Sequence, residues 1–315
     1  HMPIKIPNDL PASKILKEEN IFVMDETRAL SQRIRPLKLI IVNIMPTKIV
    51  TETQLLRLLS NTPLQIEVDW LCMESHNSKN TSQEHLMEFY KTFNEIKDNK
   101  YDGLIVTGAP VEKLKFEDVD YWDELTNIFD WANTNVFSSF FICWASQASL
   151  YYYYGVEKYQ LKEKLTGVYH HHTNPEKMRR RILRGFDYQF YAPHSRYTAV
   201  KKEDIEKIDS LDILASSNDA GVYLVAEKDG SRFFVTGHPE YDPDTLDKEY
   251  HRDLAKGGDC VMPKNYYKND DVNDEILVKW RSHAYLLFSN WLNYYVYQNT
   301  PYNLDDLLKM KTTNK

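Results

Sequence analysis

Short apolar runs and amphipathic stretches follow one another along the chain. Runs rich in β-branched and aromatic residues cover 37–44, 66–71, 103–108, 136–142 and 233–238, and each predicts a buried strand. Apolar residues recur with the helical period in 51–59, 85–94, 122–133, 145–154 and 276–298. Strands that alternate with helices are typical of a doubly wound α/β fold. We therefore predict a mostly parallel sheet flanked by helices, with a C-terminal helix.

The same pattern divides the chain into three parts. Residues 1–36 have mixed polarity and are predicted to form an N-terminal arm, of which residues 1–2 are typical of a cloning scar. Residues 37–300 hold every predicted strand and are expected to fold as a single α/β domain. Residues 301–315 are mostly polar and are predicted to be a frayed tail.

Charge and cysteine content exclude some classes of partner. The 315 residues carry a formal net charge of −7, so the chain lacks the positive field that favours nucleic acid. The sequence has no apolar run of about 18 residues, which argues against a membrane span. Its three cysteines have no paired spacing, which argues against a disulfide framework and favours a reducing compartment. We expect a cytoplasmic protein.

Two clusters of polar residues are interpreted as surface loops. One is basic, and its alternative interpretation is an edge that binds the phosphates of a nucleotide-like molecule. It consists of Lys177, Arg179, Arg180, Arg181 and Arg184. The other is the run of three histidines at 170–172. Because adjacent side chains do not converge on one ion, we predict a solvated loop there and no metal site.

Three unusual segments fall at the carboxyl ends of predicted strands. They are Gly108-Ala109-Pro110, Cys143 and His238. In a doubly wound sheet, ligands bind outside these ends, so segments that are distant in the chain are expected to meet there. The glycine of the first segment lets the main chain approach a ligand closely.

Cys143, His238 and Glu240 are predicted to form a catalytic triad. Cys143 lies at an abrupt strand-to-helix junction that is typical of a nucleophile elbow. The helix N-terminus stabilises a thiolate there, and main-chain N–H groups can hold an oxyanion. Glu240 lies two residues after His238, so its carboxylate can orient the imidazole toward the thiol. In α/β-hydrolases the acid precedes the histidine, so that family fits less well.

These residues carry a family resemblance. An elbow cysteine with a distant Gly-His-Pro-Glu resembles class I glutamine amidotransferases. Six colinear segments resemble more specifically the homoserine O-acyltransferase family of methionine biosynthesis, which contains homoserine transsuccinylases and transacetylases. The resemblance covers nearly the whole chain, from about residue 3 to residue 301. The segments are Asn43–Lys48, Thr107–Glu112, Ile142–Ala148, Pro193–Arg196, Gly237–Tyr241 and Tyr250–Asp253.

The resemblance implies a reaction in two steps. Cys143 takes the acyl group from acyl-coenzyme A as a thioester, and coenzyme A leaves. His238, held by Glu240, then removes the proton of the homoserine hydroxyl, which attacks the acyl-enzyme. Such covalent catalysis predicts ping-pong kinetics.

The resemblance also implies the binding residues. Lys48 and the main-chain N–H of Trp144 are the candidates for the oxyanion hole. Lys164, Ser195 and Arg252 are implied to contact homoserine, and an arginine suits its carboxylate because it donates two parallel hydrogen bonds. The substrates are homoserine and acyl-CoA as a co-substrate, with no permanently bound cofactor. The family is typically homodimeric.

Glu112 is the residue linked to the choice of acyl donor. In this family a glycine here accompanies succinyl transfer and a glutamate accompanies acetyl transfer. A glutamate fills the space that a longer acyl chain needs and repels the free carboxylate of a succinyl group. Two such charges about 4 Å apart, at an effective dielectric constant of about 20, repel by roughly 4 kcal/mol. We predict an acetyl-type member that uses acetyl-CoA, with succinyl-CoA as the alternative donor.

Some features leave other interpretations open. After Cys143-Trp144 the family usually has Gly-Ala, whereas this chain has Ala145-Ser146, which could stiffen the elbow although both residues are small. The triad alone also fits a glutamine amidotransferase or a γ-glutamyl peptidase, although no synthetase domain is present in this sequence to receive ammonia. A non-catalytic relative that only binds a ligand is the third interpretation, against which an intact triad argues.

Overall fold

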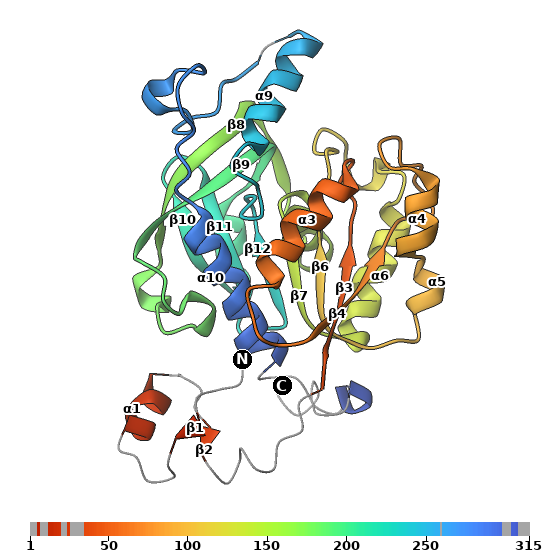
Figure 1. The fold of residues 1–315 in the computed structure, drawn as a ribbon, viewed down its shortest axis with the longest axis vertical. Helices are drawn as coiled ribbons and strands as arrows, with labels where there is room; N and C mark the ends of the chain where they lie inside the picture. The colour runs from red at the N-terminus through yellow and green to blue at the C-terminus, as the bar shows by residue number, and fades with distance from the viewer. Residues whose placement is uncertain are drawn as a thin grey trace.

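The computed structural model describes residues 5–6, 12–19, 24–25, 35–258, 260–297 and 304–307. The predicted cloning scar, most of the N-terminal arm and most of the polar tail lie outside these residues. A ten-stranded sheet forms the centre of the described chain, with helices packed on both of its faces (Figure 1).

The elements of the main sheet and its helices lie between residues 37 and 297. The strands are β3 (Leu37–Val42), β4 (Ile66–Leu71), β5 (Tyr90–Lys91), β6 (Tyr101–Val106), β7 (Val136–Ile142), β8 (Lys158–Thr173), β9 (Gln189–Val200), β10 (Leu211–Ser217), β11 (Gly221–Glu227) and β12 (Arg232–Val235). The α-helices are α3 (Lys48–Leu59), α4 (Gln83–Phe89), α5 (Phe93–Ile96), α6 (Trp122–Asn135), α7 (Trp144–Tyr154), α8 (Lys202–Glu206), α9 (Thr245–Lys256) and α10 (Arg281–Trp291). Outside the main sheet, α1 (Ala12–Glu18) and a small parallel pair, β1 (Lys5–Ile6) with β2 (Met24–Asp25), precede it.

The sheet has a parallel half and an antiparallel half. Its strand order is β5-β4-β3-β6-β7-β12-β11-β10-β8-β9. Every pairing from β5 to β12 is parallel, and every pairing from β12 to β9 is antiparallel. The predicted mostly parallel sheet flanked by helices, with a C-terminal helix, is confirmed. The sequence pattern did not reveal the antiparallel half formed by β8 to β11.

Alternate residues of the parallel strands pack into two separate cores. Phe140 of β7 contacts Phe288 and Trp291 of α10, with ring centroids 4.9 and 5.3 Å apart. The next residue, Phe141, points to the other face and contacts Phe129 of α6 at 5.5 Å. Helices α3 and α10 therefore cover one face of the sheet, while α6 and α7 cover the other (Figure 1). Burial on both faces explains why these strands are continuously apolar.

Two predicted helices differ from those in the structure. In place of one helix over 85–94, α4 ends at Phe89, and β5 and α5 follow. The break occurs because Tyr90 is buried beside β4 and donates a 2.7 Å hydrogen bond to Glu52. The predicted helix over 276–298 begins only at Arg281, since Leu277 N–H donates to the carbonyl of Tyr266 and this segment runs as extended chain. After Trp291 the chain continues as a π-helix over Leu292–Tyr297, and residue 298 lies outside the described part.

The predicted solvated loop at 170–172 is wrong. These histidines lie within β8, and their side chains alternate across the strand, so that His170 and His172 are exposed while His171 is fully buried. Alternation with a period of two is the expected pattern of a strand. Because all three residues are histidine, the order of polar and apolar residues in the sequence does not reveal this alternation.

Candidate active site

Cys143 occupies a strained junction between β7 and α7. Its φ and ψ angles are 49° and −114°, in a region that non-glycine residues rarely adopt. The backbone is held in place because Cys143 N–H donates to Val235 O at 2.7 Å, and the Cys143 carbonyl accepts from Ser146 N–H at 2.9 Å. The side chain is only 2% exposed. The structure therefore has the sharp strand-to-helix turn that the sequence predicts for Cys143.

His238 lies opposite this cysteine, just past the end of β12. Its Nδ1 is 2.7 Å from Glu240 Oε1, and both side chains are buried. Burial by itself lowers the pKa of His238, but the neighbouring Cys143 and Glu240, which both hydrogen-bond to the ring, raise this pKa well above the usual histidine range. One ring nitrogen is thus held by the carboxylate and the other faces the thiol, which is the geometry of a nucleophile, base and acid triad.

Gly108 allows the nucleophile and the base to approach each other. It follows β6, the strand beside β7. A methyl group at this position would lie 3.1 Å from His238 Cε1 and 3.3 Å from Cys143 Cβ. The three strand-end segments predicted to meet do meet, because β6, β7 and β12 are neighbours in the parallel half of the sheet.

The predicted homoserine contacts lie on the antiparallel half and on α9, joined by two acids. Lys164 of β8 donates to Asp253 at 2.9 Å, and Arg252 pairs with the same carboxylate at 2.9 Å. Ser195 of β9 donates to Glu249 at 2.7 Å, and Lys164 lies 3.9 Å from that carboxylate. The structure thus gathers all three predicted residues into one charged cluster.

Glu249 is a candidate site residue that sequence reasoning missed. It belongs to α9, whose many charged residues are typical of a solvated helix, and it lies one residue before the family-like segment Tyr250–Asp253. Tyr241 joins it to the triad: the tyrosine ring stacks on His238 with centroids 4.2 Å apart, and its hydroxyl donates to Glu249 at 2.7 Å. Its position next to that segment was the only sequence signal.

Glu112 lies in the loop after β6, close enough to the triad for mutual electrostatic influence. Burial raises the pKa of its carboxyl, while His238, Lys164 and Lys158 favour the ionised form. The Lys158 ammonium donates to the main-chain carbonyls of Glu112 and Leu114, each at 2.5 Å, and so fixes this loop. The role of this carboxylate in the choice of acyl donor stays a prediction.

Lys48 and Trp144, the predicted oxyanion donors, begin two different helices. The Lys48 side chain is 5% exposed and donates to Asn43 O at 2.7 Å and Met45 O at 3.1 Å. Burial lowers its pKa to about 8, against the opposing effects of Cys72 and Glu52. Trp144 is the first residue of α7, so its N–H has no carbonyl one turn earlier to bond to. Their contact with an oxyanion stays a prediction.

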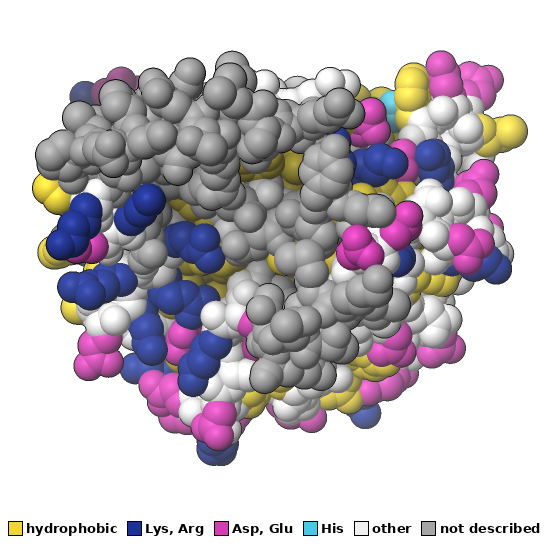
Figure 2. Space-filling model, turned by 90° about the horizontal axis from the view of Figure 1, so that it is seen from below, with side chains coloured by type: hydrophobic (Ala, Val, Ile, Leu, Met, Phe, Trp, Pro, Cys, Tyr) yellow, Lys and Arg dark blue, Asp and Glu magenta, His cyan; other side chains and the backbone are white. Residues whose placement is uncertain are grey.

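The basic cluster lies away from this site, in the connection between β8 and β9. That connection is at the lower left of Figure 1, and Figure 2 shows Lys and Arg side chains gathered on the same side of the lower face. Lys177 and Arg180 both pair with Asp212. The guanidinium groups of Arg181 and Arg184 lie over tyrosine rings. These contacts within the protein give no support to the phosphate-binding alternative.

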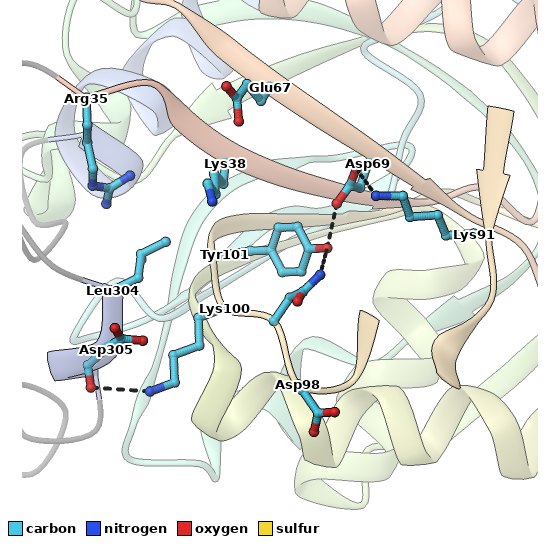
Figure 3. A pocket seen from close by; sticks show the side chains of 11 residues that line it. Arg35, Lys38, Glu67, Asp69, Lys91, Asp98, Lys100, Tyr101, Leu304 and Asp305 are labelled. Carbon is cyan, nitrogen blue, oxygen red and sulfur yellow. Dashed lines mark hydrogen bonds and ion pairs between the residues drawn. The ribbon is translucent and has the colours of Figure 1, made fainter. Parts of the chain in front are cut away.

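A hollow of about 800 Å³ opens near the amino ends of β3, β4 and β6, whereas the triad lies at the carboxyl ends of β7 and β12. Figure 3 shows the side chains that line the hollow. Its described lining contains both acids and bases, and Asp69 accepts hydrogen bonds from Lys91 at 2.9 Å and Tyr101 at 2.6 Å. Its described lining holds no cysteine, serine or histidine that could form a thiol or hydroxyl nucleophile with an imidazole base, so it does not compete with the triad as the reactive site.

Within the described ranges, no three side chains of His, Cys, Asp or Glu gather in a way that could hold a metal ion. Among the same residues, no helix is both long enough and apolar enough to cross a membrane.

Comparison with solved structures agrees with the fold. A glutamine amidotransferase from Methylobacillus flagellatus superposes with a TM-score of 0.51 at 10% identity, over 82% of this chain and 95% of that chain. One from Thermotoga maritima gives 0.50 at 11% identity, over 70% and 85%. At this identity the likeness concerns the fold alone, and it confirms the glutamine amidotransferase-like architecture.

The relatives found by sequence are much more similar to this chain than these solved structures are. A homoserine O-acetyltransferase from Catenibacterium mitsuokai is 72% identical over 98% of this chain and 100% of its own length. Relatives of the same name from Petrotoga mobilis and Acetivibrio thermocellus are 60% and 59% identical, each over 97% of this chain and over 98% and 100% of their own lengths. The family model described as homoserine O-succinyltransferase matches residues 3–302. The chain belongs to this homoserine O-acyltransferase family.

Proposed function

We propose that this protein transfers the acetyl group of acetyl-CoA to the side-chain hydroxyl of homoserine through a thioester on Cys143. The observation that carries the proposal is the buried Cys143–His238–Glu240 triad beside a cluster of paired charges that suits a zwitterion. Its three relatives that are named above are called homoserine O-acetyltransferases. The product of such a step enters methionine biosynthesis.

In the first half-reaction the thiol gives its proton to His238 and the sulfur attacks the thioester carbonyl of acetyl-CoA. The bond between that carbonyl carbon and the coenzyme A sulfur breaks, and coenzyme A leaves as a thiol with the proton from His238. Trp144 N–H and the Lys48 ammonium are the proposed donors to the oxyanion that forms in between.

In the second half-reaction the homoserine hydroxyl gives its proton to His238, and its oxygen attacks the acetyl-enzyme. The ester forms as the carbon–sulfur bond to Cys143 breaks, and His238 gives the proton to the released Cys143 thiolate. Glu240 stabilises the imidazolium that exists in both steps. Because coenzyme A leaves before homoserine reacts, the kinetics are ping-pong.

The charged cluster supplies complementary groups for the acceptor. Arg252 is 53% exposed at its side chain and can turn its guanidinium toward the substrate carboxylate. Glu249 accepts one hydrogen bond on each oxygen, from Tyr241 and Ser195, and a carboxylate has further lone pairs for the substrate ammonium. Placing both ends of homoserine in this way leaves its hydroxyl directed at His238.

Glu112 is proposed to select acetyl over succinyl. Its partial burial leaves little room for a longer acyl chain, and its charge repels a second carboxylate. Two substitutions separate these causes. Glu112→Gln removes the charge and keeps the volume, whereas Glu112→Ala removes both. If charge dominates, the ratio of kcat/KM for succinyl-CoA over acetyl-CoA rises in both variants. A rise confined to Glu112→Ala would mean that volume decides, and no change in either would remove Glu112 from donor choice.

Intact-protein mass spectrometry tests the whole proposal. Acetyl-CoA is expected to add one acetyl group, the adduct is absent in Cys143→Ala, and homoserine discharges it. A succinyl adduct in its place keeps the family reaction and refutes the proposed donor. The absence of any adduct and of coenzyme A release refutes the reaction itself, and glutamine hydrolysis would then be assayed.

A cytoplasmic location and a homodimeric state are part of the same proposal. The three cysteines are free in the structure, which fits a reducing compartment. Light scattering coupled to size-exclusion chromatography measures the oligomeric state, and a mass near the 37.2 kDa of a single chain would exclude the dimer.

A further inference from the structure

Two fully buried histidines form a pair directly behind the candidate active site. His171 of β8 and His194 of β9 are each 0% exposed, and their Nε2 atoms lie 2.9 Å apart. The two ring planes are 13° apart and their centroids 5.1 Å apart. Aromatic rings of Phe190 and Tyr223 pack against His171 at 5.3 and 4.6 Å. The reaction described above does not use either imidazole.

The hydrogen bonds fix which nitrogen carries each proton. His171 Nδ1 lies 2.8 Å from the carbonyl oxygen of Tyr169, so this nitrogen carries a hydrogen. Burial lowers the pKa of His171 to about 3 and also lowers that of His194, so both rings are neutral. His171 Nε2 is then a lone pair, and His194 Nε2–H must be the donor. The pair is therefore a directional bond with one defined arrangement of protons.

His194 lies in a segment that touches both the base and the nucleophile. The carbonyl of Pro193 accepts from His238 N–H at 2.8 Å. On the other side of His194, Ser195 O lies 4.0 Å from Cys143 Sγ, and Ser195 Oγ holds Glu249. Any slide of residues 193–195 along the sheet would change all of these contacts together.

The main chain at Gly237 packs so closely against residues 193 and 194 that this segment has no space to shift. A methyl group on Gly237 would lie 2.6 Å from Pro193 O and 3.2 Å from His194 Cε1. The His194 ring is thus wedged between the residue before the catalytic base and the partner ring of His171. Main-chain pairing holds β9 against β8 along most of their length. The His171–His194 hydrogen bond adds a buried side-chain constraint at this point.

We propose that His171 and His194 are positioning residues, whose hydrogen bond holds residues 193–195 in register against Cys143, His238 and Glu249. The pair acts through the segment and does not contact the substrates. The His171–His194 pair differs from ordinary core packing because it requires a hydrogen-bond donor and an acceptor, and not only side chains of the right volume.

Four variants separate the hydrogen bond from packing. His171→Gln keeps an amide oxygen that can accept from His194, whereas His171→Leu has a similar volume and no acceptor. The double variant His171→Leu with His194→Leu removes both polar partners, so no buried donor is left unsatisfied. His172→Leu makes the same change at the exposed neighbouring histidine and is the matched control.

We expect His171→Leu to lower kcat for acetyl transfer by about 10- to 100-fold, because a displacement of up to about 1 Å at reacting groups costs up to roughly 100-fold in rate. His171→Gln is expected to stay within about threefold of the wild type. His171→Leu should also lower Tm, because it leaves the buried His194 N–H without an acceptor. The double variant should have the Tm of the wild type while its kcat remains low. His172→Leu should change neither Tm nor kcat. Circular dichroism establishes that each variant is folded.

The rate of Cys143 alkylation by iodoacetamide, followed by peptide mass spectrometry, provides a readout that does not depend on the proposed substrates. It should fall in the same order as kcat, so the pair can be tested even if acetyl transfer is the wrong reaction. The proposal is overturned if His171→Gln is as slow as His171→Leu, or if kcat recovers together with Tm in the double variant. Should His171→Leu fail to fold, the Gln variant and the double variant still decide between the two outcomes.

Discussion

Replacing Gly108 by alanine tests whether the contact between Cys143 and His238 is as tight as the structure indicates. The new methyl group would lie 3.1 Å from His238 Cε1 and 3.3 Å from Cys143 Cβ. Carbon atoms normally settle about 3.5–4.0 Å apart, so the ring and the cysteine must separate by several tenths of an ångström. The backbone of Gly108 is compatible with alanine, because its φ lies outside the positive range.

The expected effect is large on activity and modest on stability. A misplacement of about 1 Å at reacting groups costs roughly 100-fold in rate, so a smaller displacement should lower kcat by about 10- to 100-fold. Overpacking at one methyl group costs roughly 1–3 kcal/mol of unfolding free energy. The assays are kcat for acetyl transfer, the rate of Cys143 alkylation, and Tm.

Gly155→Ala is the matched control. Gly155 ends α7 with a φ of +72° and has no neighbour within 4 Å of the position that a methyl group would take. The same substitution there costs roughly 1–2 kcal/mol through backbone strain and should leave kcat unchanged. A Gly108→Ala enzyme with wild-type kcat, or a Gly155→Ala enzyme that loses as much activity, would show that the close approach at Gly108 has no role.

Three further predictions concern charge. Glu240→Gln should lower kcat by about 10³- to 10⁴-fold, because the amide loses the charge that stabilises the His238 imidazolium; single-turnover rates measure this, and a loss below tenfold would contradict it. If the Lys48 ammonium stabilises the oxyanion, kcat/KM should fall as pH rises through about 8, where this lysine loses its proton, and Lys48→Arg should not show that fall between pH 8 and 10. Asp102 is fully buried and accepts from both Arg35 and the Lys38 N–H, so Asp102→Asn should lower the unfolding free energy by about 2–3 kcal/mol in urea denaturation. That loss is smaller than for a fully buried pair because Arg35 is 28% exposed, and unchanged kcat is expected since the site is at the other end of the strands.

The parallel half of the fold was predictable because its signals are local. β4 and β7 have the predicted bounds, 66–71 and 136–142, since apolar runs of that length between polar segments have few alternatives. The antiparallel half gave no such signal. Strands β8 and β9 carry many polar and aromatic residues, and their pairing over a long stretch depends on contacts between residues far apart in the sequence.

The triad was predictable for a different reason. Cys143 and His238 each follow an apolar strand, and the rule that ligands bind at strand ends brings them together without knowledge of the strand order. Glu249 was not predictable in this way, because it lies on α9, a helix that sequence analysis did not predict. Its role depends on Ser195 and Tyr241, which come from β9 and from the turn after β12, and only the folded chain brings them into contact.

Strand β12 has a parallel neighbour, β7, on one side and an antiparallel neighbour, β11, on the other. The nucleophile belongs to the parallel side of this boundary, while Lys164 and Ser195 belong to the antiparallel side. The proposed nucleophile and the proposed homoserine contacts therefore lie on separate parts of the sheet. Under the proposed function, changes in β8, β9 and α9 would alter which alcohol is accepted, while the elbow and its base stay unchanged.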